Sequence, residues 1–185
     1  MPAGWSPASP PIEKAAPMKP ALFAAALFLA LPAAAQQPAA FTTADAALMT
    51  ACIEKLSSAN QAEDDPAALR PTTDCIGAAS TVCMESEDGG FSTIGMVTCT
   101  ARETDWWDSQ LNTHYAGLRE SLAPDLFATL QAAQRVWIDY RDRACGFEYD
   151  LWGEGTIRSV IHAGCMLDLT AARADRVGTY AHAEP

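Results

Sequence analysis

The sequence predicts an all-α fold, a small disulfide-linked helical bundle of about four to five helices. Apolar residues recur at steps of three and four over several long segments, and no segment alternates apolar and polar residues for long. Six cysteines all follow an apolar N-terminal segment, and an even number in such a chain is typical of a disulfide framework. They are Cys52, Cys75, Cys83, Cys99, Cys145 and Cys165.

The N-terminal residues, 1–35, have the pattern of a leader followed by a secretory signal peptide. Met18 and Lys19 precede the apolar residues 21–31, and three alanines precede Gln36. This apolar segment is shorter than the roughly 20 residues that span a bilayer, and it suits a cleavable signal. We expect translation to begin at Met18, because five prolines among the first 17 residues are atypical of a signal peptide. A translated leader is the alternative.

Export would deliver the cysteines to an oxidising compartment, so we expect a periplasmic or secreted protein. No cysteine stands at the expected cleavage site and no later segment is apolar for long enough, so we expect no stable membrane anchor. Residues 36–185 carry 22 acidic and 10 basic side chains, a net charge of −12. Such a surface repels nucleic acid and attracts a cationic partner, with solubility alone as the alternative explanation.

Five helices are expected, and polar, Gly-rich or Pro-containing segments separate them. They cover residues 43–58, 73–83, 93–121, 125–149 and 157–181. Short connections favour antiparallel neighbours among the last three. We expect the following residues to face the core: Ile94, Val97, Ala101, Thr104, Asp108, Leu111, Tyr115, Leu118 and Leu122 in the longest helix, Leu126, Leu130, Ala133, Trp137, Tyr140, Arg141 and Ala144 in the next, and Ile157, Val160, Ile161, Gly164, Leu167 and Ala171 in the last.

Asp108 and Arg141 are charged residues on these otherwise apolar faces. They stand 16 residues before and 17 residues after Pro124, at the turn between the two helices. Because both helices rise equally per residue, the two side chains are expected at one height. We predict a partly buried, bidentate Asp108–Arg141 ion pair that fixes the helix register, with a partner-binding or catalytic role as the alternative.

Trp106 and Trp107 are adjacent on the longest helix, so their side chains point about 100° apart. Both cannot lie centrally on one face. We expect one of them to pack peripherally against a loop or a disulfide, or to be exposed as an anchor for a partner.

The sequence shows no arrangement of residues that carries catalysis or holds a cofactor. No two of His114, His162 and His182 are three or four residues apart, and no Cys-x-x-Cys occurs, which argues against a zinc site. No Gly-x-Ser-x-Gly turn and no phosphate-binding loop are present. We therefore expect no metal, no cofactor and no enzymatic activity.

Several motifs together resemble the LprI-like lysozyme inhibitor family of exported bacterial proteins. The motifs are Met96-Val97-Thr98-Cys99 after Cys83, Trp107-Asp108-x-x-Leu111-Asn112-x-x-Tyr115-x-x-Leu118, Gln134-x-x-Trp137-x-x-Tyr140-Arg141-Asp142-x-x-Cys145, and Gly155-Thr156 followed by Cys165 and Thr170-x-x-Arg173. The resemblance implies a small helical domain over residues 83–182, with residues 36–82 as an added N-terminal helical extension. A membrane-attached role does not carry over, because the lipid-acceptor cysteine of some members is missing here.

The resemblance also selects among the fifteen ways of pairing six cysteines. It implies a Cys83–Cys99 and a Cys145–Cys165 disulfide inside the shared domain. Cys52–Cys75 remains for the extension.

The function that the resemblance implies is inhibition of a cationic hydrolase such as a lysozyme through protein–protein binding. Two acidic segments, residues 85–90 and 148–155, are the candidate contact regions. The residues expected to contact a partner are Glu85, Glu87, Asp88, Trp106, Glu148, Asp150 and Glu154. The alternative is a structural or stress-related periplasmic protein with no enzyme target.

Overall fold

The computed structural model describes residues 40–183, which lie in one compact unit of the chain, residues 36–185. The expected leader and signal peptide lie outside the described residues. Five α-helices and two short 3-10 helices, and no strand, occur over residues 40–183, so the predicted all-α fold class is confirmed. They are α1 (Thr43–Gln61), η1 (Pro66–Ala68), η2 (Thr72–Cys75), α2 (Ser80–Ser86), α3 (Thr93–Ser121), α4 (Pro124–Leu151) and α5 (Ile157–Ala181).

Helix α1 begins at a reciprocal cap. The Thr42 hydroxyl accepts from the backbone N–H of Asp45 at 3.1 Å, and the Asp45 carboxylate accepts from the backbone N–H of Thr42 at 2.7 Å. The helix then continues three residues beyond the predicted end at residue 58. Its inward residues Met49 and Leu56 are buried in the same core as the long helices.

The segment predicted as one helix over residues 73–83 is two helices, η2 and α2, so that prediction is wrong. Gly77 separates them with a φ of +94°, a left-handed conformation that favours glycine. The backbone N–H groups of Gly77, Ala79 and Ser80 donate to the Glu103 carboxylate of α3 instead of to helix carbonyls. A tertiary contact therefore replaces the local helical bonds.

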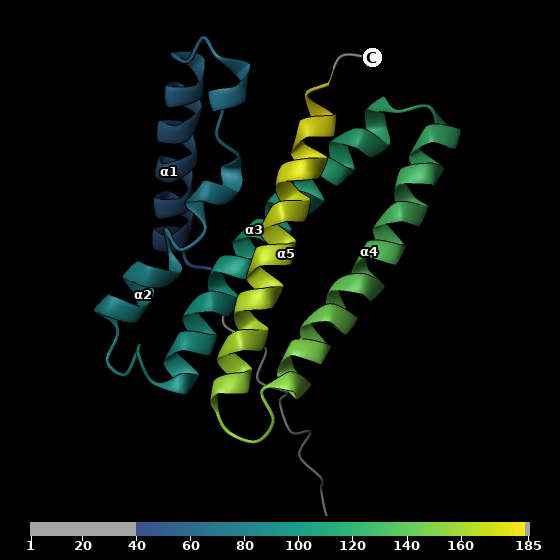
Figure 1. The fold of residues 1–185 in the computed structure, drawn as a ribbon. Helices are drawn as coiled ribbons and strands as arrows, with labels where there is room; N and C mark the ends of the chain where they lie inside the picture. Colours follow the sequence, from purple (N-terminus) through teal and green to yellow (C-terminus); the bar gives the residue numbers. More distant parts are fainter. Residues whose placement is uncertain (1–39, 184–185) are drawn as a thin grey trace, which may run out of the picture. The chain divides into compact units, whose positions relative to one another are not determined.

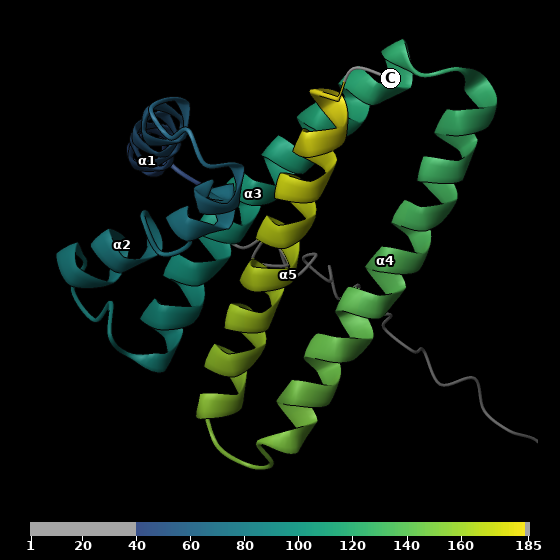
Figure 2. The same cartoon turned by 45° about the horizontal axis from the view of Figure 1, so that its top comes forward.

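The three long helices match their predicted positions within two residues. Figures 1 and 2 show α3 and α5 side by side. Helix α4, which connects them in the chain, runs in the opposite direction. Helix α4 packs mainly on α5 and stands apart from α3 along most of its length. Consequently, α3 and α5 begin at the same end of the bundle, where the α2–α3 segment and the α4–α5 turn also lie.

The hydrophobic core lies between α1 with η2, α3 and α5. Its buried members include Met49 and Leu56 from α1, Cys75 from η2, Trp106, Trp107, Leu111 and Leu118 from α3, and Leu167, Ala171, Ala174 and Val177 from α5. Helix α4 adds only the partly buried Leu130 and Trp137. The N-terminal helix is thus part of the main core.

The predicted inner faces are correct in part. Leu111, Leu118, Leu167 and Ala171 are buried as expected. Ile94 is 80% exposed, Tyr140 57% and Leu126 56%, and Ile157 is also exposed. The buried face of α3 passes through Cys99, Glu103 and Trp107. The spacing of apolar residues does not indicate this face, because Glu103 is polar.

Three disulfides each join two helices that are close in sequence. Cys52–Cys75 joins α1 to η2, Cys83–Cys99 joins α2 to α3, and Cys145–Cys165 joins α4 to α5, with Cα–Cα distances of 5.9, 5.6 and 5.5 Å. These are the pairs that the family resemblance implied. Within residues 40–183, no helix has the length and apolar character needed to cross a bilayer.

Candidate functional site

Both adjacent tryptophans of α3 are buried. Trp106 is 6% exposed and Trp107 is 2% exposed, and their rings meet edge to face with centroids 5.0 Å apart. The expectation that one of them is peripheral is wrong, because α3 packs against α5 and also has α1 and α2 as neighbours. Trp106 therefore cannot serve as an exposed anchor for a partner.

Asp108 and Arg141 line the same cavity between α3 and α4, but the structure does not join them in an ion pair. Asp108 accepts a hydrogen bond from the Asn112 side chain at 2.8 Å. Arg141 donates through Nε and Nη2 to Asp142, its neighbour in sequence, at 3.0 and 2.9 Å. The equal distances from the turn do bring the two residues to one cavity. Because α4 stands apart from α3, each finds a nearer partner.

Arg173 of α5 also lies close to this cavity. The Nε of Arg173 donates to the Gln134 side chain at 2.8 Å, and its Cζ lies 5.7 Å from the ring centroid of Trp137. The Cζ of Arg141 lies 5.1 Å from the same centroid. Burial lowers the pKa of Arg173, with the Tyr180 charge acting the other way. Gln134, Trp137 and Arg173 all belong to the sequence motifs, but the sequence predicts only a core position for Trp137 and no role for the other two.

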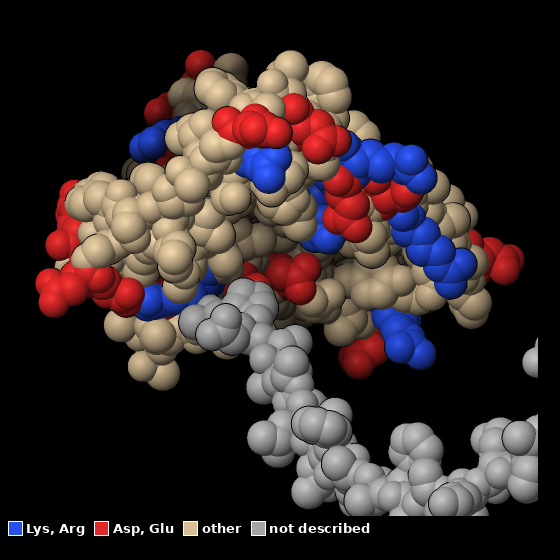
Figure 3. Space-filling view, turned by 90° about the horizontal axis from the view of Figure 1, so that it is seen from below, with Lys and Arg blue, Asp and Glu red and all other residues tan. Residues whose placement is uncertain are grey.

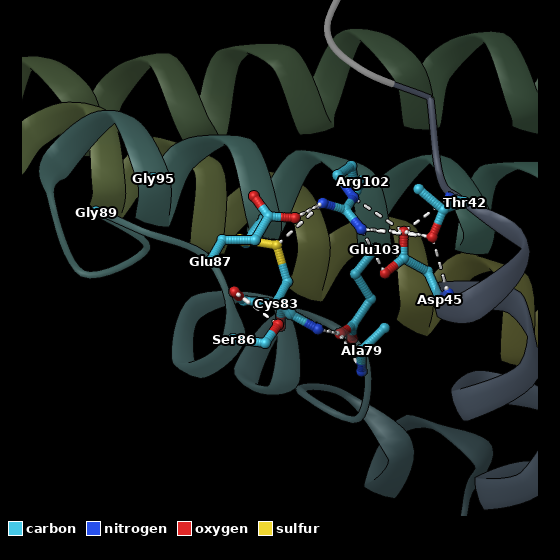
Figure 4. The surroundings of a disulfide bond; sticks show 12 residues. Thr42, Asp45, Ala79, Cys83, Ser86, Glu87, Gly89, Gly95, Arg102 and Glu103 are labelled. Carbon is cyan, nitrogen blue, oxygen red and sulfur yellow. Dashed lines mark hydrogen bonds and ion pairs between the residues drawn. A yellow bond between two sulfur atoms is a disulfide. The ribbon is translucent and has the colours of Figure 1, made fainter.

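The acidic segment before α3 is held by an arginine that the sequence did not single out (Figure 4). Arg102 pairs with Asp45 at 2.7 Å and with Glu87, and its Nη1 contacts the sulfur of Cys83. Burial raises the pKa of Asp45, but the Thr42 backbone N–H and Arg102 outweigh burial and hold this pKa below its usual value. Arg102 is thus shared between Asp45 and the exposed Glu87, and Glu85 and Asp88 are exposed carboxylates of this segment that Arg102 does not bind.

Glu103, next to Arg102, is a fully buried carboxylate that the sequence analysis missed. It accepts from the backbone N–H of Gly77 at 2.7 Å, of Ala79 at 3.1 Å and of Ser80 at 2.7 Å. The last two N–H groups lie at the start of α2, where the Ala79 side chain offers no cap. The carboxylate therefore replaces a helix cap, and its role is structural.

Cys83, Glu87 and Cys99 also bring three potential metal ligands close together. The disulfide between the two cysteines consumes both thiolates, which are the groups that a metal would bind. This cluster therefore does not fit a metal ion in the oxidised protein.

The α4–α5 turn carries the second acidic segment together with exposed apolar side chains. Helix α4 extends to Leu151, so Glu148 and Asp150 lie on its last turn and Glu154 lies in the turn itself. Exposed fractions are 64% for Phe147, 65% for Leu151 and 51% for Trp152.

This turn is held in one shape by several contacts. Gly153 and Gly155 have φ values of +61° and +133°, which other residues rarely adopt. Arg158 donates to the Gly153 carbonyl at 3.0 Å and lies 4.4 Å from the Tyr149 ring centroid. The Cys145–Cys165 disulfide joins α4 to α5 next to the turn.

The fold and these sites define a small, disulfide-linked helical protein in which many charged groups tie helices together or lie exposed at one end. The family model described as "Lysozyme inhibitor LprI" matches residues 83–176, just over half of the chain, so the chain belongs to the LprI family. The matched region includes the acidic segment before α3, the α3–α4 cavity and the α4–α5 turn. No curated protein and no solved structure matches the chain.

Proposed function

We propose that this chain is an exported inhibitor that binds a cationic lysozyme through the end of the bundle where α3 and α5 begin. The observation that carries the proposal is membership of a family described as lysozyme inhibitors, with a match that spans both segments at this end. The pattern of a secretory signal and the three disulfides support export to the bacterial periplasm or beyond.

The charge of this end supports a cationic partner. Glu85 and Asp88 are exposed on one side, and Asp150 and Glu154 on the other. Viewed from this end, acidic side chains form several separate groups, and basic side chains lie beside some of them (Figure 3). The full sequence carries a net charge of −11. A negative surface accelerates encounter with a positive partner, and salt weakens this effect.

The α4–α5 turn supplies what a tight contact needs beyond charge. Phe147, Leu151 and Trp152 offer aromatic and apolar side chains of the kind that anchor protein interfaces. The glycines, Arg158 and the disulfide order the turn before binding, which reduces the entropy lost on association. Glycosidases bind their substrates in a cleft with two carboxyl groups, and a rigid protruding turn can enter such a cleft.

The test is an assay of cell-wall lysis by lysozymes of several types, with the purified oxidised protein at physiological salt. We expect saturable inhibition of at least one type, and a loss of at least about ten-fold in potency for Trp152→Ala. Val136→Ala is the matched control, because Val136 is 70% exposed on α4 but lies four helical turns from the α4–α5 turn.

Two further results would contradict the proposal. Inhibition that vanishes at physiological salt would indicate nonspecific charge attraction. Absence of inhibition with every lysozyme type would favour a structural or stress-related envelope protein.

A further inference from the structure

The cavity between α3 and α4 is distinct from the acidic end and has a volume of about 300 Å³. This volume is at the lower end of the range for ligand sites, roughly 300–1,000 Å³, and suits an amino acid or a very short peptide. Its walls combine charged, amide and apolar side chains from two helices. No proposed step of lysozyme inhibition uses it.

Opposite charges face this cavity from opposite walls without neutralising each other. Asp108 lies on the α3 wall, and Arg135 and Arg141 lie on the α4 wall. Within residues 40–183, no ion pair joins Asp108 to either arginine, although Arg141 pairs with Asp142. That pairing uses Nε and Nη2, so the Nη1 edge of Arg141 is left for another acceptor.

The α4 wall has further positive charge behind it. Arg173 adjoins Trp137 from α5, and its Nη2 is buried without a hydrogen-bond partner in the described part of the chain. Its Nε is bound by the neutral Gln134 and not by a carboxylate. A half-buried cation that is bound by no carboxylate favours the approach of a negative group to this wall.

We propose that this cavity binds a zwitterionic ligand, a free amino acid or short peptide, with its ammonium group at Asp108 and its carboxylate at Arg141. A ligand with only a carboxylate would leave Asp108 without a partner, and a ligand with only an amine would leave the arginines without one, so a zwitterion gains more than either. Leu111, Tyr115 and Ile138 line the same cavity and give an apolar side chain a surface to pack against. Gln131 and Gln134 offer amide groups that can bind a peptide unit.

The experiment is titration calorimetry of the full oxidised protein with four probes, followed by amide chemical-shift mapping by NMR. The probes are leucine, the dipeptide leucyl-leucine, leucinamide and N-acetylleucine. The first two are zwitterions, leucinamide lacks the carboxylate, and N-acetylleucine lacks the ammonium group. We expect saturable binding of at least one zwitterion, with shifts around Asp108 and Arg141, and binding at least about ten-fold weaker for both blocked forms.

Variants assign the two ends of the ligand. Asp108→Asn should abolish the preference for leucine over N-acetylleucine, and Arg141→Gln should abolish the preference for leucine over leucinamide. Arg143→Gln is the matched control, since this side chain is 79% exposed and pairs with Asp139 outside the cavity. Unchanged thermal unfolding of each variant shows that the fold is retained.

Three results would overturn the proposal: no saturable binding of either zwitterion, equal binding of the blocked forms, or zwitterion binding that Asp108→Asn and Arg141→Gln leave unchanged. None of these results depends on lysozyme, so they are independent of the proposed inhibition.

Discussion

Helices α3 and α4 are nearly equal in length, 29 and 28 residues, but they have opposite roles in the fold. Helix α3 buries seven residues, including Glu103, Trp106 and Trp107, between neighbours on two sides. Helix α4 buries only Cys145 and packs mainly on α5. Helix α3 is the centre of the core, whereas α4 is joined to α5 by a disulfide and contributes only a few partly buried side chains to the core.

This difference separates stability from binding in the protein. The buried side chains of α3 are committed to the core, so substitutions of these residues are expected to destabilise the protein. Helix α4 keeps apolar residues such as Tyr140 and Phe147 exposed and lines the α3–α4 cavity. Both proposed binding regions therefore depend on α4, and the following predictions test that division.

The largest expected effect is on α3. Trp107→Ala should lower the free energy of unfolding by about 3–5 kcal/mol, because it removes a 98% buried aromatic side chain from a packed core. Trp152→Ala, at the end of α4, should change it by no more than about 0.5 kcal/mol. Urea denaturation of the two variants measures both values. Equal losses would show that the two helices are not energetically distinct.

The second effect concerns the attachment of α4. Replacing Cys145 and Cys165 together by serine should cost about 3 kcal/mol, since the disulfide closes a loop with a sequence separation of 20. Hydrogen exchange should then become faster in α4 than in α3, because only α4 loses its main attachment. If α3 and α4 exchange equally fast in this variant, α4 is held by its packing and not by the disulfide.

The third effect tests the buried carboxylate of α3. Glu103→Gln keeps the volume but places an NH₂ group among three backbone N–H donors, so we expect a loss of about 2 kcal/mol. Glu120→Gln, an exposed position on the same helix, is the control and should be neutral. Thermal unfolding of the two variants gives the comparison, and a neutral Glu103→Gln would show that the charge of Glu103 is not required.

The smallest effect is a difference in pH dependence between the contact of α5 with α3 and its contact with α4. Burial and His182 lower the pKa of His114, at the α3–α5 contact, from 6.5. The unfolded chain then binds more protons in the window below pH 6.5, so His114 should make stability fall as the pH falls through it. Burial and Glu148 raise the pKa of Asp168, at the α4–α5 contact, from 3.8. Here the folded state binds more protons above pH 3.8, so stability should fall as the pH rises.

Melting temperatures between pH 3 and pH 8 measure both slopes. His114→Gln should flatten the curve just below pH 6.5 and leave the acidic window unchanged. Asp168→Asn should do the reverse. If His114→Gln changes the slope only in the acidic range, or Asp168→Asn changes it only just below pH 6.5, the assignment of these groups to the two contacts is wrong.

The helices themselves could be predicted from the sequence because their signals are local. Ser92 caps α3, Pro124 starts α4 and the Gly153–Gly155 segment ends it, and the predicted bounds agree within two residues. The segment around Gly77 was mispredicted because its backbone N–H groups bind Glu103, which lies 26 residues away in sequence. No local pattern contains that contact.

The candidate site residues were also predictable only where their positions depend on local structure. Helical rise placed Asp108 and Arg141 at one cavity, since rise depends only on sequence position. Whether they pair depends on how far α4 lies from α3, and that distance is set by the packing of both helices on α5. The burial of both Trp106 and Trp107 likewise depends on α3 having two neighbours.

By itself, the sequence determined the fold class, the long helices, the acidic charge and the family, and through the family the cysteine pairs. These properties depend on local propensity, composition and motifs. Only the tertiary structure decided which faces are buried, that Glu103 caps α2, and that the charges of Asp108 and Arg141 face a cavity without pairing. Burial and pairing depend on the positions of neighbouring helices, and many side chains distributed over the whole chain set those positions together.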